Sequence, residues 1–110
     1  MHTIVEIPQY SRKADKLLSE IEKNEIISYL AFHPKAGEIL AGTGGIRKIR
    51  WKREGKGKSG GFRIIYYFHN EDIPLFLLSI FSKGEMANIN KAERNALAKL
   101  TKILIQQYKR

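Results

Sequence analysis

The sequence contains no cysteine among its 110 residues, and this absence removes several functional classes at once. A chain without cysteine has no disulfide framework, no thiolate nucleophile and no zinc site built on cysteine ligands. Histidine is also sparse, because His2, His33 and His69 lie far apart and form no paired ligand motif. The sequence therefore predicts no metal centre, and it predicts no small-molecule cofactor.

Long apolar runs are missing too, since no segment approaches the roughly 18 consecutive apolar residues of a membrane span. The N-terminal residues also lack the apolar stretch of a secretory signal peptide. We therefore expect a soluble cytoplasmic protein with no membrane partner. With 43% hydrophobic and 28% charged residues, the composition is that of a folded globule, and the length predicts one domain over residues 1–110.

Acidic residues are scarce relative to basic ones: 11 Asp and Glu stand against 20 Lys and Arg, which gives a net charge of +9. The excess is concentrated in residues 47–63, where Glu54 is the single acid among many lysines and arginines. A concentrated excess creates a local potential that attracts polyanions, whereas a uniform excess indicates little beyond solubility. Because Ile46, Ile49 and Trp51 alternate with these charges, we expect a basic strand anchored in a sheet rather than a solvated loop.

The first part of the chain predicts a strand and two helices. Residues 3–7 form a short apolar strand that the following proline ends. Apolar residues then recur at helical spacing over residues 10–21, and a second helix follows with Asn24 as its candidate N-cap. This helix should end before Pro34, because the residue preceding a proline avoids the helical conformation. Residues 34–45 are rich in glycine and predict a loop.

The rest of the chain predicts three strands and a final helix. The strands cover about 46–52, 61–69 and 74–82, and their short polar connections favour antiparallel neighbours. The middle strand is nearly continuous in bulky residues, which is typical of a central strand covered on both faces. Asn90 is the candidate cap of the last helix, whose stripe of leucines ending at Tyr108 is predicted to be buried. The order β-α-α-β-β-β-α indicates an α+β fold, in which a small, mainly antiparallel twisted sheet packs with an N-terminal helical hairpin and a C-terminal helix.

Strand alternation sorts the basic residues by face. Lys48 and Arg50 share one face of the first basic strand, whereas Arg47 shares the opposite face with Ile49. If the hairpin register places Arg63 of the next strand beside Lys48 and Arg50, the three cations converge on one surface. Like charges at that spacing repel unless an anion lies between them, so the pattern favours a phosphate-binding site.

Three segments, GTGGIRKIR (42–50), GKGKSGGFRIIYYF (55–68) and LSIFSKGEMANIN (78–90), carry a family resemblance. In this order and spacing they resemble the RelE/ParE superfamily of type II toxin–antitoxin toxins, and in particular its HigB-type, RelE-like branch. The resemblance extends over essentially the whole chain and implies the RelE-like fold. It further implies an mRNA endoribonuclease that acts in the ribosomal A site, inhibits translation, and is neutralised by a cognate antitoxin, a HigA-like helix-turn-helix protein.

The resemblance implies cleavage by attack of the ribose 2′-hydroxyl on its own phosphate, giving a 2′,3′-cyclic phosphate and a 5′-hydroxyl without a metal. This chemistry needs a base, positive charge on the phosphorane and help for the leaving oxygen. Lys48 aligns with a lysine of the RelE active strand and is the candidate base, since crowding by other cations favours a neutral amine. Arg50 and Arg63 match basic strand residues of the family and would hold the phosphate.

The general acid stays open between two residues. Lys83 matches the lysine that precedes the family's C-terminal helix, and it would stabilise charge or donate to the leaving oxygen. Glu85 is the alternative acid/base group, and Gly84 occupies the position of an arginine in RelE. Other basic residues are assigned to RNA binding: Arg47, Lys56 and Lys58. The two lysines alternate with glycines, which predicts a loop that contacts ribosomal RNA through phosphates.

Two other functions remain as alternatives. A ParE-like toxin shares the fold but inhibits DNA gyrase by protein contact, and the clustered strand cations argue against it because that branch needs no RNA-cutting site. A non-catalytic RNA-binding domain would bind with strong salt dependence and cleave nothing. The aromatic residues Trp51, Tyr66 and Tyr67 are predicted to belong to the core, and His69 to a turn.

Overall fold

The computed structural model describes residues 2–52, 61–82 and 90–108, which contain three helices and one five-stranded sheet. The elements in chain order are β1 (Ile4–Glu6), α1 (Pro8–Leu17), α2 (Glu20–Phe32), β2 (Glu38–Ile39), β3 (Ile46–Trp51), β4 (Phe62–Tyr67), β5 (Leu75–Ser82) and α3 (Lys91–Tyr108). The strand order is β1-β5-β4-β3-β2, with β1 parallel to β5 and the other neighbours antiparallel. The predicted α+β class and mainly antiparallel sheet are confirmed.

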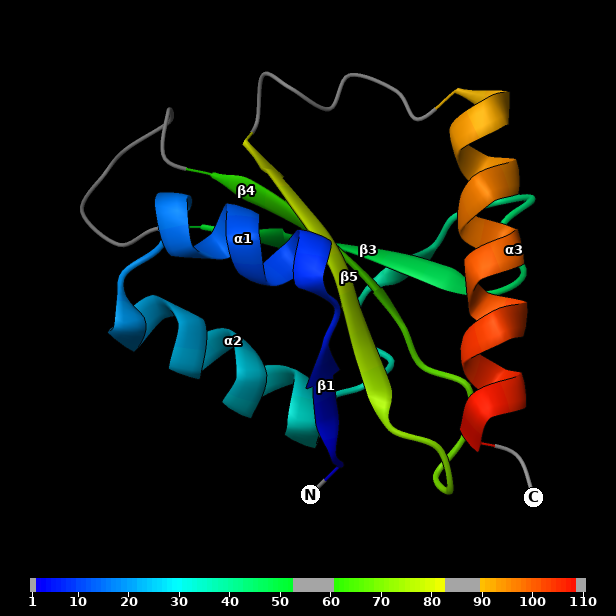
Figure 1. Ribbon diagram of the computed structural model, residues 1–110. Coiled ribbons are helices and arrows are strands. Elements are labelled where there is room, and N and C mark those ends of the chain that lie inside the picture. The colour runs from blue at the N-terminus through cyan, green and yellow to red at the C-terminus, as the bar shows by residue number, and fades with distance from the viewer. Residues whose placement is uncertain (1, 53–60, 83–89, 109–110) are drawn as a thin grey trace.

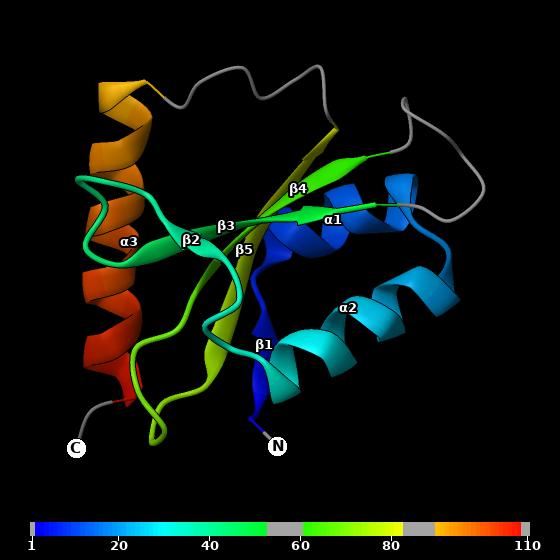
Figure 2. The same cartoon turned by 180° about the vertical axis from the view of Figure 1, so that it is seen from behind.

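The helices cover both sides of the sheet (Figures 1 and 2). α1 and α2 lie together on one side, and α3 lies on the other. Alternate residues of β4 enter the two resulting cores: Ile64 and Tyr66 pack with the helical hairpin, whereas Ile65 and Tyr67 pack with α3. β4 is therefore the central strand covered on both faces that the sequence predicted. We call these two sides of the sheet the hairpin face and the α3 face.

The start of the second helix differs from the prediction. Asn24 lies inside α2, and the N-cap is Ser19. The Ser19 Oγ accepts the N–H of Glu22 at 3.1 Å, and the Glu22 carboxylate accepts the N–H of Ser19 at 2.9 Å, which completes a capping box. Ile21, expected on the buried stripe, is 71% exposed. The apolar periodicity continues across the break between the helices, so the reciprocal cap decides where α2 begins. Its end at Phe32 agrees with the prediction.

The segment predicted as a loop contains a further strand. β2 pairs with β3 and places Glu38 opposite Lys48. The turn that follows is held by Thr43, whose Oγ1 donates to the Leu40 carbonyl at 2.6 Å and accepts the N–H of Ile46 at 3.1 Å. The three glycines of this turn adopt φ between 75° and 108°, a region that other residues rarely adopt. A two-residue strand shows too little alternation to be recognised from sequence.

The C-terminal helix begins as predicted. Asn90 Oδ1 accepts the N–H of Glu93 at 2.8 Å and caps α3. Leu104 is buried against the α3 face, but Tyr108 at the end of the stripe is 45% exposed and contacts Phe76 through a ring edge, with centroids 5.4 Å apart. Among the described residues, no helix is both long and apolar enough to cross a membrane.

The Tyr10 hydroxyl is buried in the hairpin-face core without a hydrogen-bond partner among the described residues. Tyr10 is 1% exposed, and its hydroxyl has no hydrogen bond within the described residues. We expect Tyr10→Phe to raise the free energy of unfolding by about 1 kcal/mol at pH 7, because an unsatisfied buried hydroxyl is costly. Urea denaturation measures the change. Tyr66→Phe is the matched control and should lower stability, since its hydroxyl accepts a backbone N–H at 2.8 Å.

Tyr10→Phe should also change how the stability of the protein depends on pH above neutrality. Burial, with a smaller contribution from Glu6, raises the pKa of the Tyr10 phenol above its ordinary value of 10.0. An acid whose pKa is raised by folding supports stability fully below its unfolded pKa and loses that support as the pH rises. The wild type should therefore lose more stability than Tyr10→Phe between pH 7 and about pH 10.5. Equal losses in the two proteins would contradict this assignment.

Candidate functional site

Lys48, Arg50 and Arg63 lie together on the α3 face of the sheet. Arg50 and Arg63 are direct partners across the β3–β4 ladder. Lys48 shares their face and pairs with Ile65, so it stands diagonally across from Arg63. The Cβ atoms of directly opposed residues are about 4.5–5.5 Å apart, and those of diagonal neighbours are about 7–8 Å apart. The register that the sequence left conditional is therefore the one that brings these cations together.

The cations border a hollow of about 530 Å³, located where β2 ends and leaves the rest of β3 as the sheet edge. It is lined by Tyr29, Ala36, Gly37, Glu38, Lys48, Ile49, Arg50 and Arg63. Arg50 is exposed, and Lys48 and Arg63 are half-buried. Within the described residues, no carboxylate lies within 4.0 Å of these three cations as an ion-pair partner. Cations left unneutralised beside a hollow favour an anionic ligand.

Glu38 is a candidate that the sequence analysis missed. It lines the same hollow, its side chain is exposed, and it stands directly opposite Lys48 across the β2–β3 pair. A carboxylate in this place is a second group able to accept a proton, besides the predicted base Lys48. The only signal for it is strand pairing, because no motif in the surrounding sequence marks Glu38 as functional.

Arg47 lies on the hairpin face, as alternation predicted. Its Nη1 donates to the carbonyl oxygens of Gly37 at 2.8 Å and Lys35 at 3.3 Å. These bonds give the guanidinium a structural task, which is to hold the segment that leads into β2. An RNA contact through the same nitrogen atoms would compete with them, so the assignment of Arg47 to RNA stays a prediction.

Gly37 fits tightly between β3 and the core. Its N–H donates to the Tyr66 hydroxyl at 2.8 Å, and a Cβ at this position would lie 2.9 Å from both the Lys48 carbonyl oxygen and Tyr66 Cε1. Tyr66 is fully buried, and this burial raises the pKa of its phenol. The contacts of Arg47, Gly37 and Tyr66 thus place β2, and with it Glu38, against Lys48.

We expect Gly37→Ala to lower the free energy of unfolding by about 1–3 kcal/mol, the usual cost of overpacking. Both nearest neighbours, a backbone carbonyl and a buried ring, have little freedom to move away. Gly61→Ala is the control, because a Cβ there meets its nearest atom, the Trp51 carbonyl oxygen, only at 4.0 Å. Urea denaturation of both variants measures the difference. Coincident unfolding midpoints would show that the segment yields to the added methyl group.

The remaining predicted residues divide into two groups. The aromatic side chains belong to the core as expected: Tyr66 and Tyr67 are buried, and Trp51 packs edge-on against Tyr29 with centroids 5.6 Å apart. Four predicted site residues lie outside the described residues: Lys56, Lys58, Lys83 and Glu85. Their roles stay predictions. Over the described ranges, no three His, Asp or Glu side chains gather as metal ligands.

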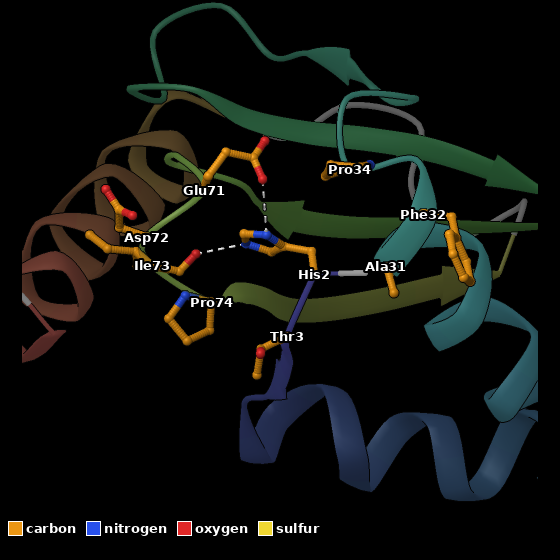
Figure 3. A pocket seen from close by; sticks show the side chains of 9 residues that line it. All are labelled: His2, Thr3, Ala31, Phe32, Pro34, Glu71, Asp72, Ile73 and Pro74. Carbon is orange, nitrogen blue, oxygen red and sulfur yellow. Dashed lines mark hydrogen bonds and ion pairs between the residues drawn. The ribbon is translucent and has the colours of Figure 1, made fainter.

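Another hollow, of about 390 Å³, lies at the other end of β4 (Figure 3). His2 forms its wall, with Nε2 2.7 Å from the Ile73 carbonyl oxygen and Nδ1 3.7 Å from the Glu71 carboxylate. The imidazole also meets the Phe68 ring edge-on, with centroids 5.0 Å apart. These contacts anchor the start of the chain to the turn between β4 and β5. Glu71 and Asp72 make this hollow acidic, so it does not suit phosphate.

Comparisons with known proteins identify the family and the fold of this chain. The family model described as RelE toxin of the RelE/RelB toxin–antitoxin system matches residues 19–110, a range that includes all three clustered cations. Among solved structures, a variant of Escherichia coli toxin RelE with two arginines replaced by alanine, in the free state, matches with a TM-score of 0.60. The match has 20% sequence identity and covers 94% of this chain and 98% of that chain, which supports the shared fold. From the family match over most of its length, the chain belongs to the RelE family of toxins of toxin–antitoxin systems.

Proposed function

We propose that this toxin is an endoribonuclease of the HigB-type branch that cleaves mRNA in the ribosomal A site and so inhibits translation. The observation that carries the proposal is the pairing of Arg50 with Arg63, with Lys48 diagonal to Arg63, on one face of the sheet. No described carboxylate neutralises them by an ion pair. In a toxin of the RelE family, the anion that suits such a cluster is the phosphodiester of a message.

In the proposed reaction the 2′-oxygen attacks phosphorus and the bond to the 5′-oxygen breaks. Lys48 is the proposed base, which accepts the 2′-hydroxyl proton. Arg63 and Arg50 hold the non-bridging oxygens and stabilise the charge that develops on the phosphorane. The products are a 2′,3′-cyclic phosphate and a 5′-hydroxyl, and no step is assigned to a metal. Glu38 is the second candidate for the base, because it faces Lys48 across the strand pair.

The proton for the 5′-oxygen comes from Lys83 or Glu85 in this proposal, both of which lie outside the described residues. The hollow is open and offers few groups to orient a flexible RNA. Positioning by the ribosome would supply the orientation that the toxin does not provide by itself. Lys56 and Lys58 would then hold ribosomal RNA. Residues 1–110 would act as a single toxin domain in the cytoplasm, with a HigA-like antitoxin as partner.

The test is cleavage of a defined message. Purified toxin is added to ribosomes stalled with a known codon in the A site, and to the same RNA without ribosomes. Primer extension maps the cuts, and end analysis identifies the cyclic phosphate. We expect cuts inside the A-site codon on ribosomes and no cuts on free RNA. An intact message on the ribosome, together with normal translation after induction in cells, would end the proposal.

The two alternatives give different results in the same preparation. A gyrase-directed toxin would block supercoiling of plasmid DNA by purified gyrase and leave the message intact. An RNA-binding domain without catalysis would bind RNA with an affinity that falls steeply with salt, and would also leave the message intact.

A further inference from the structure

A slot of about 180 Å³ lies between the α3 face of the sheet and the first turns of α3. Its lining consists of Gln9, Ile65, Ser79, Phe81, Glu93, Ala96 and Leu97. This slot belongs to the surface that carries the cations, because Phe81 pairs directly with Arg63 and Ile65 pairs directly with Lys48. Adjacent strands are about 4.8 Å apart, so the slot begins one strand away from the clustered cations.

Two rows of side chains run across the sheet and join these features. One row is Arg50, Arg63 and Phe81, and the other is Lys48, Ile65 and Ser79. In the first row the charges stand on β3 and β4 and the slot residue on β5. In the second row the charge stands on β3 and the slot residues stand on β4 and β5. A nucleotide whose phosphate is held by the cations would therefore reach the slot along the same surface.

Polar groups are placed at particular points in an otherwise apolar slot. Ser79 is 4% exposed, and its Oγ accepts a long hydrogen bond of 3.4 Å from Gln9 Nε2. A buried hydroxyl normally both donates and accepts, and within the described residues the Ser79 hydroxyl only accepts, so its hydrogen can be donated to a ligand. Glu93, in the first turn of α3, adds an acidic residue to the lining of the slot. The Phe81 ring is held by Lys13, whose Nζ lies 3.7 Å from the ring centroid.

Building on the proposed function, we propose that this slot takes the nucleobase of a nucleotide adjacent to the scissile phosphate and selects a base that carries an exocyclic amino group. The apolar walls of Phe81 and Leu97 suit the faces of a flat ring. Ser79 and Gln9 bond its edge, and the Glu93 carboxylate accepts a hydrogen from the amino group of adenine, cytosine or guanine. Uracil carries the carbonyl oxygen O4 where cytosine carries its amino group, and this oxygen has no hydrogen to donate to the carboxylate.

A nucleobase suits the slot better than a protein side chain because of its continuity with the cations. Each phosphodiester is attached through a ribose to a base on either side, so a phosphate at Lys48 and Arg63 brings a base to this surface. The slot is also small, mostly apolar and edged by hydrogen-bonding groups, which is the pattern that base recognition needs.

The test uses purified toxin on ribosomes stalled at messages that differ only in the A-site codon. The wild type should cleave at least about 10-fold more slowly when uracil occupies one particular codon position. Glu93→Gln should reduce this discrimination to about twofold or less, because an amide can both donate to and accept from a base. Cleavage of the favoured codon should also slow by a few-fold, because a neutral amide oxygen accepts the amino hydrogen more weakly than a carboxylate does.

The matched control is Glu20→Gln, which removes a carboxylate from the first turn of another helix, α2, away from the slot. It should keep the wild-type codon profile. Ser79→Ala is the second variant and should slow cleavage of the favoured codons several-fold relative to the wild type, through the lost hydrogen bond to the base.

Each other outcome overturns the inference. Equal cleavage of uracil-containing codons by the wild type, or unchanged discrimination in Glu93→Gln, would show that the slot reads no base. Unchanged codon profiles combined with weaker inhibition by the antitoxin would assign the slot to that protein partner. If the wild type cleaves no codon on the ribosome, the proposed function itself fails, and the inference fails with it.

Discussion

Replacing Arg63 by alanine is expected to lower the rate of message cleavage on the ribosome about 100- to 1,000-fold, the usual cost of removing one preorganised charge-stabilising group. Arg63 stands at the centre of the cationic surface, paired with Arg50 on one side and with Phe81 on the other. It lies on the central strand, so its backbone is fixed by two neighbouring strands. Single-turnover cleavage at saturating toxin measures the loss directly.

Arg12→Ala is the matched control, because Arg12 is an exposed arginine of α1 outside the hollow. It should cleave at the wild-type rate. Arg63→Lys keeps a charge but loses the planar pair of donors, so an intermediate rate is expected. Near wild-type cleavage by Arg63→Ala, in a variant that unfolds at the normal urea concentration, would remove Arg63 from the proposed mechanism.

Replacing Lys48 by alanine is expected to lower the single-turnover rate about 100- to 10,000-fold, the range for loss of a general base. The more informative variant is Lys48→Arg, which keeps the positive charge but cannot release its proton at ordinary pH. We expect it to be as slow as Lys48→Ala. Lys16→Ala, an exposed lysine at the end of α1, is the control and should leave the rate unchanged.

Glu38 is the alternative to Lys48 as the general base. If Lys48→Arg keeps most of the activity and Glu38→Gln loses it, the carboxylate opposite Lys48 is the base and the lysine only holds charge. If both variants are slow, their pH–rate profiles separate the roles, because the variant that lacks the base loses the rising limb. Full activity in both would contradict each assignment.

The two faces of β3 have different roles in the site. On the α3 face, Lys48 and Arg50 are available to an anion, while on the hairpin face Arg47 bonds the carbonyl oxygens that lead into β2. Gly37 then sits close enough to Tyr66 to donate a hydrogen bond to its hydroxyl. The alternation of one strand thus produces both the cationic surface and the support that keeps Glu38 beside it.

Much of the fold, and the sorting of the cations by face, could be predicted from the sequence. The strands that carry Lys48, Arg50 and Arg63 begin and end within a residue or two of the predicted limits, and the Asn90 cap of α3 is correct. These features are local: side chains alternate with a period of two along a strand, and a cap needs residues only three positions apart. The sorting of Arg47 away from Lys48 follows from the same alternation.

Other features required contacts between distant segments. The sequence alone determined an α+β chain with basic strands and placed their cations by face. Only the tertiary structure decided that Arg50 stands opposite Arg63, that a two-residue strand puts Glu38 opposite Lys48, and that Ser79 and Glu93 meet across a slot. The physical reason is that register and helix placement are set by hydrogen bonding and packing over the whole sheet, which no local pattern records.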